Sequence, residues 1–313
     1  MLTGQTRRFG TVFKLVLAVF VVTDAAILLI RHWPPARLAA VVALRHNHGC
    51  TLARAIESTR QGASQLAIRE RLFQSFHLVE TNADGLALWN TSKGPYWIPN
   101  GCERVLSHNL AEQERRIYEA GSVTVKRGDT VLDCGANVGV FTRVALDAGA
   151  RLVVAIEPAP ENVACLRRNF ANEIASGRVI VYPKGVWDKD DVLVLHIYPH
   201  NSARDSFVVN WKEATETVKV PLTTIDALVS ELKLSRVDFI KMDIEGAEKR
   251  ALAGAKGTLI RFQPQLAIAA EHLPDDGETI PLVVRNLSPA YQVECGPCVD
   301  LGNATTPDVL YFR

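Results

Sequence analysis

Two acidic residues end neighbouring apolar segments at a spacing that is typical of nucleotide sites. Asp133 ends an apolar run and begins a glycine-containing turn, DCGANVGVFT. A strand that breaks into such a turn and continues as a helix brings backbone N–H groups close to a ligand. Glu157 ends the next apolar run, RLVVAIEP, where an acidic residue can bind a ribose. The pattern therefore predicts a site for an adenosine-containing cofactor.

The turn lacks two glycines that a dinucleotide site requires. The pattern G-x-G-x-x-G needs glycine at positions 135, 137 and 140, but Asn137 and Val140 occupy the last two. Those glycines make room for a pyrophosphate, and the carboxylate of Asp133 is a poor neighbour for one. S-adenosylmethionine carries a sulfonium, an ammonium group and a ribose, but no phosphate. The turn favours this cofactor, and an ordinary βα turn of a parallel sheet is the alternative interpretation.

A second charged cluster lies in the segment 237–256, VDFIKMDIEGAEKRALAGAK. Its apolar run predicts a buried strand that delivers Lys241, Asp243 and Glu245 near its carboxyl end, where open α/β sheets bind ligands. Two carboxylates and an amine at that edge are costly unless they are solvated, paired or used. A divalent metal on the two carboxylates is only a weak alternative, because alternate residues of a strand face opposite ways, and we assign no metal ligand from the sequence.

The elements that position these residues alternate between strands and helices. Near-continuous Val, Ile and Leu in the strands indicate burial on both faces, as in a doubly wound parallel sheet. The expected fold is therefore α/β, with a Rossmann-like, mostly parallel sheet of seven strands. These strands are expected within 123–135, 151–158, 178–187, 237–246, 264–272, 290–296 and 308–313.

Residues 11–30, TVFKLVLAVFVVTDAAILLI, form the only long apolar stretch of the sequence. A stretch of about 20 residues is just long enough to span a bilayer as a helix, although Asp24 opposes insertion. We expect an uncleaved single-pass membrane anchor, with a cleavable signal peptide and a buried or interfacial helix as the alternatives. The flanking arginines are more numerous after the stretch than before it, which favours a cytoplasmic catalytic domain.

The chain is expected to have three parts. These are an N-terminal anchor over 1–35, a helical and hairpin extension over 36–109, and a catalytic domain over 110–313. Helix-like apolar spacing within 36–76 and two short apolar runs about an Asn-Ala-Asp-Gly turn predict the extension.

The composition bears on the partners and the compartment. Lys and Arg number 35 against 34 Asp and Glu, and no basic run or aromatic-basic interleaving appears, which argues against nucleic acid as a partner. The six cysteines are scattered, which indicates a reducing compartment. The one close pair, Cys295 and Cys298, lies in a Gly/Pro turn with no second pair at metal-ligand spacing, so we interpret it as incidental.

Taken together, several segments resemble the FkbM family of methyltransferases. They are DCGANVGVFT, AIEPAPENVACLRRN, PLTTIDAL, KMDIEGAE, the Glu271-His272 pair and the terminal DVLYFR. The resemblance runs from about residue 110 to 313 in the expected order, and KMDIEGAE is its most specific piece. It implies the class I methyltransferase fold and does not cover residues 1–80.

The resemblance implies a binding site for S-adenosylmethionine at the ends of the first strands. Glu157 would accept hydrogen bonds from the ribose hydroxyls, and Asp243 would lie near the sulfonium end or near the acceptor. The methionine moiety and ribose would be held by Asp133, Gly135, Asn137 and Gly139. The adenine would be walled by Gly185, Val186 and Trp187, although Trp187 is equally typical of a core aromatic at a sheet edge.

The resemblance also implies the chemistry, which is O-methylation of a hydroxyl on a sugar, glycan or other small metabolite. Alignment of the two reactants supplies much of the rate, and a general base must take the hydroxyl proton. Asp243, Glu245 and His272 are the candidates for that base. The acceptor would meet the loops within 196–217 and 80–110.

Two other functions are weighed against this one. A catalytically silent, membrane-anchored module could keep the fold as a binding scaffold. An N-methyltransferase acting on protein or nucleic acid would carry an Asn/Asp-Pro-Pro-Tyr/Phe signature after the fourth strand, where MDIEG stands instead. The acceptor itself and the oligomeric state are not indicated by any pattern.

Overall fold

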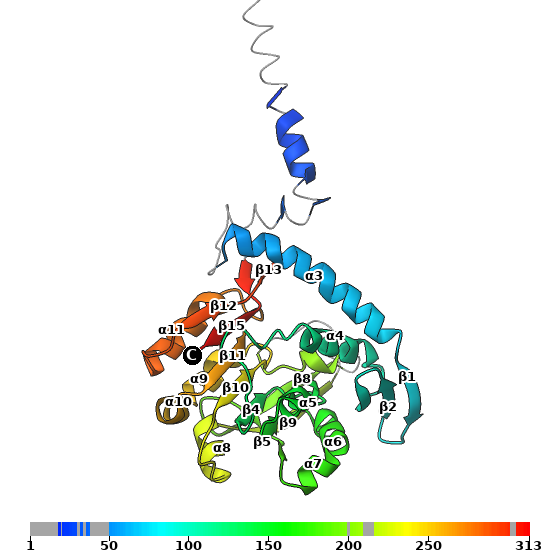
Figure 1. Ribbon diagram of the computed structural model, residues 1–313, viewed down its shortest axis with the longest axis vertical. Helices are drawn as coiled ribbons and strands as arrows, with labels where there is room; N and C mark the ends of the chain where they lie inside the picture. The colour runs from blue at the N-terminus through cyan, green and yellow to red at the C-terminus, as the bar shows by residue number, and fades with distance from the viewer. Residues whose placement is uncertain are drawn as a thin grey trace, which may run out of the picture.

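A seven-stranded, mostly parallel sheet forms the centre of the chain (Figure 1). The computed structural model describes residues 18–19, 21–29, 32–33, 36–37, 50–198, 201–208, 216–300 and 305–313. The strand order is β12-β15-β11-β10-β4-β5-β6. The bounds are β4 (Thr130–Cys134), β5 (Leu152–Ile156), β6 (Val179–Tyr182), β10 (Phe239–Met242), β11 (Gln265–Ala269), β12 (Val293–Cys295) and β15 (Val309–Phe312).

The predicted mostly parallel α/β fold is confirmed. Strands β4, β5, β6, β10 and β11 pair in parallel, and β15 lies antiparallel to both β11 and β12. Each of the seven strands falls within the range expected for it. Short, fully apolar runs are reliable strand signals when the sheet is covered on both faces.

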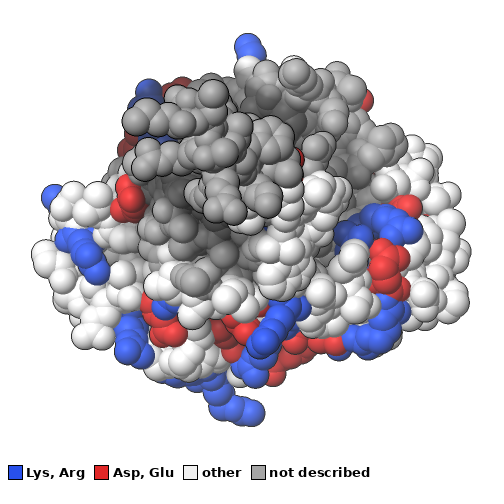
Figure 2. Space-filling model, turned by 90° about the horizontal axis from the view of Figure 1, so that it is seen from above, with Lys and Arg blue, Asp and Glu red and all other residues white. Residues whose placement is uncertain are grey.

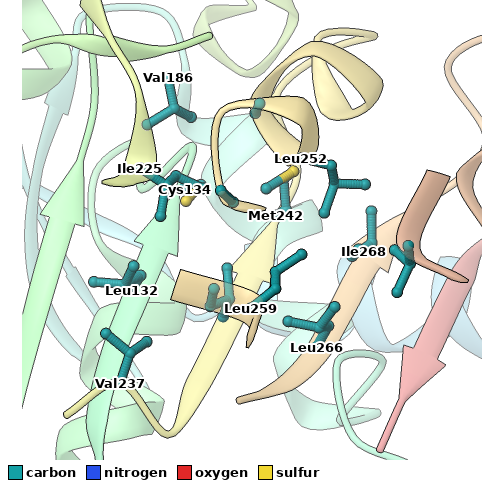
Figure 3. Packing of buried hydrophobic residues seen from close by; sticks show 14 of the residues in the cluster. Leu132, Cys134, Val186, Ile225, Val237, Met242, Leu252, Leu259, Leu266 and Ile268 are labelled. Atoms are coloured by element: carbon teal, nitrogen blue, oxygen red, sulfur yellow. The ribbon is translucent and has the colours of Figure 1, made fainter. Parts of the chain in front are cut away.

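Helices cover both faces of this sheet, because alternate residues of each strand point to opposite sides. On one face Leu132, Met242 and Ile268 pack against Leu252 and Leu259 (Figure 3). On the other face, residues such as Val131 and Val153 pack against α5 and α6. The first face is covered by α8 (Ile225–Glu231), α9 (Glu248–Ala253), α10 (Lys256–Phe262) and α11 (Asp276–Leu287), and the second by α5 (Val140–Asp147), α6 (Pro160–Asn169) and α7 (Ala171–Ala175).

The N-terminal extension forms a layer of its own against the sheet domain. It consists of α3 (Leu52–Phe73), β1 (His77–Thr81), β2 (Leu86–Thr91), β3 (Gly94–Pro99) and α4 (Glu103–Glu114). The predicted hairpin is part of a three-stranded sheet. The sequence does not indicate its third strand, because Pro95 and Pro99 are atypical of a strand. Leu72 and Tyr96 share a buried cluster with Val138 and Val140, so the extension packs directly beside the turn after β4.

Two smaller sheets complete the described part of the chain. Strands β7 (Gly185–Val186), β9 (Glu216–Thr223) and β8 (Asp191–Ile197) form the first, and the 3-10 turn η1 (Ser202–Arg204) follows β8. Strands β13 (Cys298–Asp300) and β14 (Thr305–Pro307) form the second.

The prediction of a membrane-spanning helix over residues 11–30 is wrong. Within that segment residues 18–19 and 21–29 are helical, and 11–17, 20 and 30 lie outside the described residues. No helix in the described part of the chain is long and apolar enough to cross a membrane. A bilayer core of roughly 30 Å needs about 20 helical residues at 1.5 Å each. The expected single-pass localisation with a cytoplasmic catalytic domain is overturned with it.

A disulfide joins Cys50, just before α3, to Cys298 at the start of β13. Their Cα atoms lie 6.0 Å apart across a separation of 248 residues. Cys298 therefore has a structural role and is not incidental, although it does not pair with Cys295. The expected reducing compartment is contradicted, because disulfides are rare there. No spacing in the sequence marks the Cys50–Cys298 pair, because only the packing of α3 beside the C-terminal hairpin brings the two thiols together.

Candidate functional site

A cavity of about 540 Å³ lies where β4, β5 and β10 end, a size that suits a small molecule. Gly135 and Asn137 of the turn after β4 form one wall. Val105, His108 and Glu112 of α4 form another, so the N-terminal extension helps to close the site. Parallel strands end at one edge of a sheet, which is why residues far apart in the sequence meet here.

The turn after β4 requires glycine at two positions for different reasons. Gly135 has φ +77°, and a Cβ there would collide with the carbonyl oxygen of Asp243. Gly139 has φ +95°, and a Cβ there would collide with the ring of Phe170. Gly135 lines the cavity and Gly139 does not. Gly135 therefore lets the backbone approach both β10 and a ligand, whereas Gly139 serves the packing of α5.

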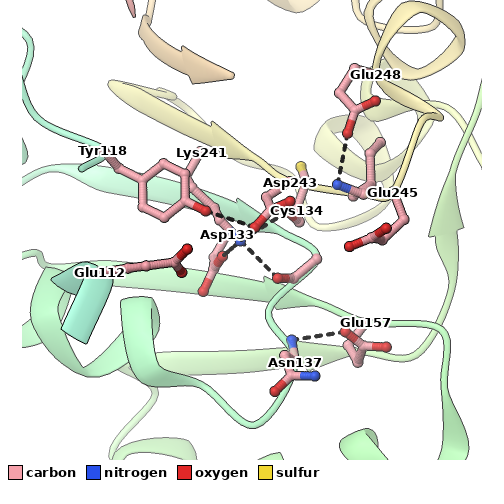
Figure 4. Close-up of polar contacts among 12 residues, drawn as sticks. Glu112, Tyr118, Asp133, Cys134, Asn137, Glu157, Lys241, Asp243, Glu245 and Glu248 are labelled. Atoms are coloured by element: carbon pink, nitrogen blue, oxygen red, sulfur yellow. Dashed lines mark hydrogen bonds and ion pairs between the residues drawn. The ribbon is translucent and has the colours of Figure 1, made fainter. Parts of the chain in front are cut away.

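Glu157 faces the turn from the end of β5 (Figure 4). Its Oε2 accepts a hydrogen bond of 2.8 Å from the backbone N–H of Asn137, and its Oε1 accepts one of 2.9 Å from Ala159. Burial raises the pKa of Glu157 to about 7 against these stabilising hydrogen bonds. Oε1 also accepts from the side-chain amide of Asn162 at 3.5 Å, so Oε2 is the oxygen that keeps a lone pair for a ligand hydroxyl.

Asp133 supports the turn from below and does not line the cavity. It is fully buried, and its Oδ2 accepts a hydrogen bond of 2.6 Å from the hydroxyl of Thr142. Its Oδ1 lies 3.4 Å from Nζ of Lys241, which also donates to the carbonyl oxygen of Gly135 at 2.8 Å. The predicted contact of Asp133 with the methionine moiety stays a prediction. In the structure Asp133 binds Thr142 and Lys241 and so stabilises the turn.

Asp243 and Glu245 lie just beyond β10 and line the cavity. The hydroxyl of Tyr118 donates a hydrogen bond of 2.7 Å to Oδ2 of Asp243 (Figure 4). Burial raises the pKa of Asp243, but the cations Lys241 and His272 outweigh it and hold that pKa below its usual value. Burial raises the pKa of Glu245 to about 8, against the opposing effect of His272.

His272 is packed among three carboxylates. Its Nδ1 lies 3.0 Å from Oε1 of the fully buried Glu248, and its Nε2 faces Asp243 at 3.4 Å and Glu245 at 3.6 Å. Burial alone would lower the pKa of His272, but these carboxylates outweigh it and raise the pKa well above its usual value. The structure thus brings all three candidate bases into one cluster.

The segment after the third strand divides between the cavity and the core. Gly185 and Val186 line the cavity, and Trp187 does not. The Trp187 ring packs against the buried cluster of Leu195 and Leu222 in the β8–β9 sheet. The contact of Gly185 and Val186 with the adenine stays a prediction. Trp187 lies in the core, which was the alternative interpretation of this residue.

A comparison with known families assigns the chain. The family model of the methyltransferase FkbM domain matches residues 133–294, slightly more than half of the sequence. The chain belongs to the FkbM family. The resemblance drawn from the sequence is therefore confirmed, and the matched segment spans β4 to β12, which includes most of the cavity.

The individual relatives are distant from this chain. It is 27% identical over 168 residues to 31-O-demethyl-FK506 methyltransferase FkbM of Streptomyces tacrolimicus. The aligned segment covers 45% of this chain and 65% of that protein. The chain is 27% identical over 143 residues to Methyltransferase 1 of Beauveria bassiana (strain ARSEF 2860), and this alignment covers 40% of this chain and 57% of that protein. The chain thus spans less than two thirds of either relative.

Among solved structures, the methyltransferase FkbM from Methylobacillus flagellatus KT is similar at 18% identity. The likeness covers 83% of this chain and 62% of that chain, with a TM-score of 0.47.

Several residues of the FkbM site were not assigned from the sequence. Glu248 lies within KMDIEGAE, so the motif itself could have indicated it. Tyr118 lies 125 residues before Asp243 and carries no pattern. Ser202 and Ser206, by contrast, belong to the loop 196–217, which the sequence predicts to meet a polar acceptor. Ser202 lines the cavity and its carbonyl accepts from Asn137, whereas the hydroxyl of Ser206 donates to the carbonyl oxygen of Glu245 at 2.7 Å. Of the expected acceptor loop, residues 199–200 and 209–215 lie outside the described residues.

Proposed function

We propose that this chain is an S-adenosylmethionine-dependent O-methyltransferase that acts on a hydroxyl of a sugar, glycan or other small metabolite. One observation carries the proposal. The turn after β4, whose Asn137 binds Glu157, and the carboxylates of Asp243 and Glu245 meet at a single cavity of about 540 Å³. His272 does not line this cavity but lies within 3.6 Å of both carboxylates. A methyl donor and its acceptor must lie together for an in-line transfer, and this cavity offers each a distinct wall.

The residues of the turn fit the cofactor. A Cβ at Gly135 would collide with the backbone of Asp243, so only glycine lets the turn keep its place at the cavity wall. Glu157 lines the same cavity. Bound S-adenosylmethionine would supply an electrophilic methyl group on sulfur. Gly135 and Asn137 would hold it through the backbone, and Glu157 would accept from its ribose hydroxyls.

The charge of the cavity supports a cationic ligand. Carboxyl groups on its wall outnumber the basic side chains there, and Asp243 stays ionised because nearby cations hold its pKa below its usual value. Arg69 and Arg104 at the wall are both paired with Glu70, which removes part of the positive charge. A sulfonium and an ammonium group suit such a site, whereas a polyphosphate does not.

The acceptor wall supports transfer to a small hydroxyl compound. Asp243 and Glu245 line the cavity, where either could take the proton of a bound hydroxyl, and a base works best when its pKa lies near the working pH. The raised pKa of His272 keeps it protonated, so it is the weakest of the three candidates. Burial brings the pKa of Glu245 to about 8. Among the residues coloured in Figure 2, basic and acidic side chains are interspersed, which does not suit a nucleic-acid acceptor.

Calorimetry on the full chain tests the proposal. S-adenosylmethionine should bind with a single site, and Glu157→Gln should weaken binding at least about tenfold, because hydrogen bonds to a charged group contribute about 1.5–3 kcal/mol. Asp147→Asn, an exposed carboxylate at the end of α5, is the matched control and should bind as the wild type does. Absence of binding by the wild type removes the proposal.

A second measurement separates catalysis from a silent binding module. Release of labelled methyl groups into a panel of sugar and small-molecule hydroxyl acceptors should occur with the wild type. In Asp243→Asn it should fall by at least about a hundredfold while cofactor affinity changes little. Cofactor binding without transfer to any hydroxyl of the panel would instead support the silent module.

A further inference from the structure

Three potential ligand atoms converge at the edge of the cavity from two different strands. Asp243 and Glu245 follow β10, and His272 follows β11. Nε2 of His272 lies 3.4 Å from Oδ1 of Asp243 and 3.6 Å from Oε1 of Glu245. One ligand atom from each residue lies within 4.8 Å of the other two.

These separations match the coordination sphere of one divalent cation. Nitrogen and oxygen ligands lie about 2.1 Å from such an ion, so two ligands at right angles are about 3.0 Å apart and two at the tetrahedral angle about 3.4 Å. The His272–Asp243 and His272–Glu245 separations lie at or just above that range. The third separation, between carboxylate oxygens of Asp243 and Glu245, is within 4.8 Å.

Glu248 supplies an independent observation in favour of a metal ligand at His272. It is fully buried, and its Oε1 accepts from the backbone N–H of Ile244 at 2.9 Å while facing Nδ1 of His272 at 3.0 Å. A carboxylate on one ring nitrogen keeps a proton there, so that a metal ion can replace the proton on the other nitrogen, as in carboxylate–histidine–metal sites. Nε2 then points at two carboxylate oxygens, an arrangement that a cation would stabilise.

The two carboxylates are also free to serve as ligands. Oδ2 of Asp243 is occupied by the hydroxyl of Tyr118, which leaves Oδ1 directed at His272. The expectation that Asp243 and Glu245 face opposite ways assumed a continuing strand, but β10 ends at Met242. Glu245 adopts φ +54°, a left-handed conformation, and Ser206 holds its carbonyl oxygen. This conformation brings the two carboxylates to the same side.

We propose that Asp243, Glu245 and His272 bind a divalent transition-metal cation, and that Glu248 is the positioning residue for His272. Three protein ligands on one side of an octahedral ion leave three positions open for water or for a bound molecule. The open side faces the cavity, because Asp243 and Glu245 both line it.

The cation would select the acceptor, and this step rests on the proposed function. A compound with two adjacent hydroxyls, as in a sugar diol, could occupy two open positions, and the metal would lower the pKa of the coordinated hydroxyl. Its proton passes to water. The O–CH₃ bond then forms as the S–CH₃ bond breaks, and the bonding electron pair stays on sulfur.

Manganese binding to the metal-stripped full chain tests the site without any turnover. Titration followed by electron paramagnetic resonance should show one saturable Mn²⁺ site, with a nitrogen coupling from the imidazole of His272. Glu245→Gln should weaken binding at least about tenfold, and Glu248→Gln should weaken it about 10–100-fold. Asp275→Asn, a carboxylate near His272 that pairs with Lys249, is the control and should bind as the wild type does.

The outcomes separate the metal site from the proposed function. No saturable Mn²⁺ site, no nitrogen coupling, or unchanged affinity in a correctly folded Glu245→Gln protein would overturn the metal site. Binding of S-adenosylmethionine to the metal-stripped protein would then still stand. Conversely, Mn²⁺ binding without any cofactor binding would remove the proposed function and leave the metal site in place.

Discussion

The ammonium group of Lys241 on β10 donates a hydrogen bond of 2.8 Å to the carbonyl oxygen of Gly135 in the turn after β4. The same group lies 3.4 Å from Asp133 and 4.0 Å from Asp243. One buried cation thus joins the two halves of the site, and Figure 4 shows it between them. Its neutralisation should affect both stability and cofactor binding.

We expect Lys241→Met to lower the free energy of unfolding by about 3–5 kcal/mol, because it leaves the buried carboxylate of Asp133 without a cation. Denaturant unfolding measures the change. Lys219→Met, on the exposed surface of β9, is the control and should cost less than about 0.5 kcal/mol. Adding Asp133→Asn to Lys241→Met should recover part of the loss, and a strictly additive double variant would contradict the pairing.

Cofactor affinity should depend on pH through Glu157. Its pKa of about 7 in the folded chain means that the carboxylate is largely protonated below neutrality. Ribose hydroxyls donate to the ionised form, so binding should tighten as the pH rises toward 7 and level off above it. Calorimetry between pH 5.5 and about 8.5 should show up to about a tenfold change per pH unit on the acid side. The difference should vanish in Glu157→Gln; an equal slope in that variant would assign the effect to another group.

Gly135→Ala should abolish cofactor binding, with a loss of at least about a hundredfold. The new Cβ would collide with the carbonyl oxygen of Asp243 and push the turn away from β10. Gly85→Ala is a matched control, because Gly85 has the same φ of +77° but open space around it. Both variants carry the same backbone strain, so equal losses of affinity would show that the close approach to β10 has no role.

Tyr118→Phe should lower kcat about tenfold with little change in the affinity for the cofactor. The hydroxyl of Tyr118 fixes one oxygen of Asp243, and its loss frees that carboxylate to rotate. Methyl-transfer kinetics measure the change. The control is Tyr182→Phe, which removes a comparable hydrogen bond to the exposed Glu231 away from the cavity. If both variants lose kcat equally, Tyr118 does not position Asp243.

Reduction of the Cys50–Cys298 disulfide should lower Tm. The link closes a loop spanning 248 residues, for which chain entropy gives a stabilisation of at most about 5 kcal/mol. Cys50→Ser should lower Tm as reductant does, and reductant should then have no additional effect. Cys295→Ser, which changes a half-buried cysteine near Cys298, should leave Tm nearly unchanged. A wild-type Tm that does not respond to complete reduction would contradict a stabilising role.

The sequence predicted the sheet and most of the cavity wall, because both depend on local patterns. Apolar runs placed all seven strands, and the rule that ligands bind beyond the carboxyl ends of parallel strands brought Gly135, Glu157 and Asp243 together. The apolar stretch at 11–30 led to a wrong prediction of a membrane-spanning helix. Its length and composition suit a bilayer, but no helix in the described part of the chain is long and apolar enough to cross one.

Only the tertiary structure decided which polar groups act together. Tyr118 reaches Asp243, Glu248 reaches His272, and Cys50 reaches Cys298 across long separations in the sequence. The left-handed backbone at Glu245 reversed the expected direction of its side chain. Strand periodicity fixes which edge of the sheet binds a ligand, but side-chain partners depend on turns and on packing between layers, and neither leaves a period in the sequence.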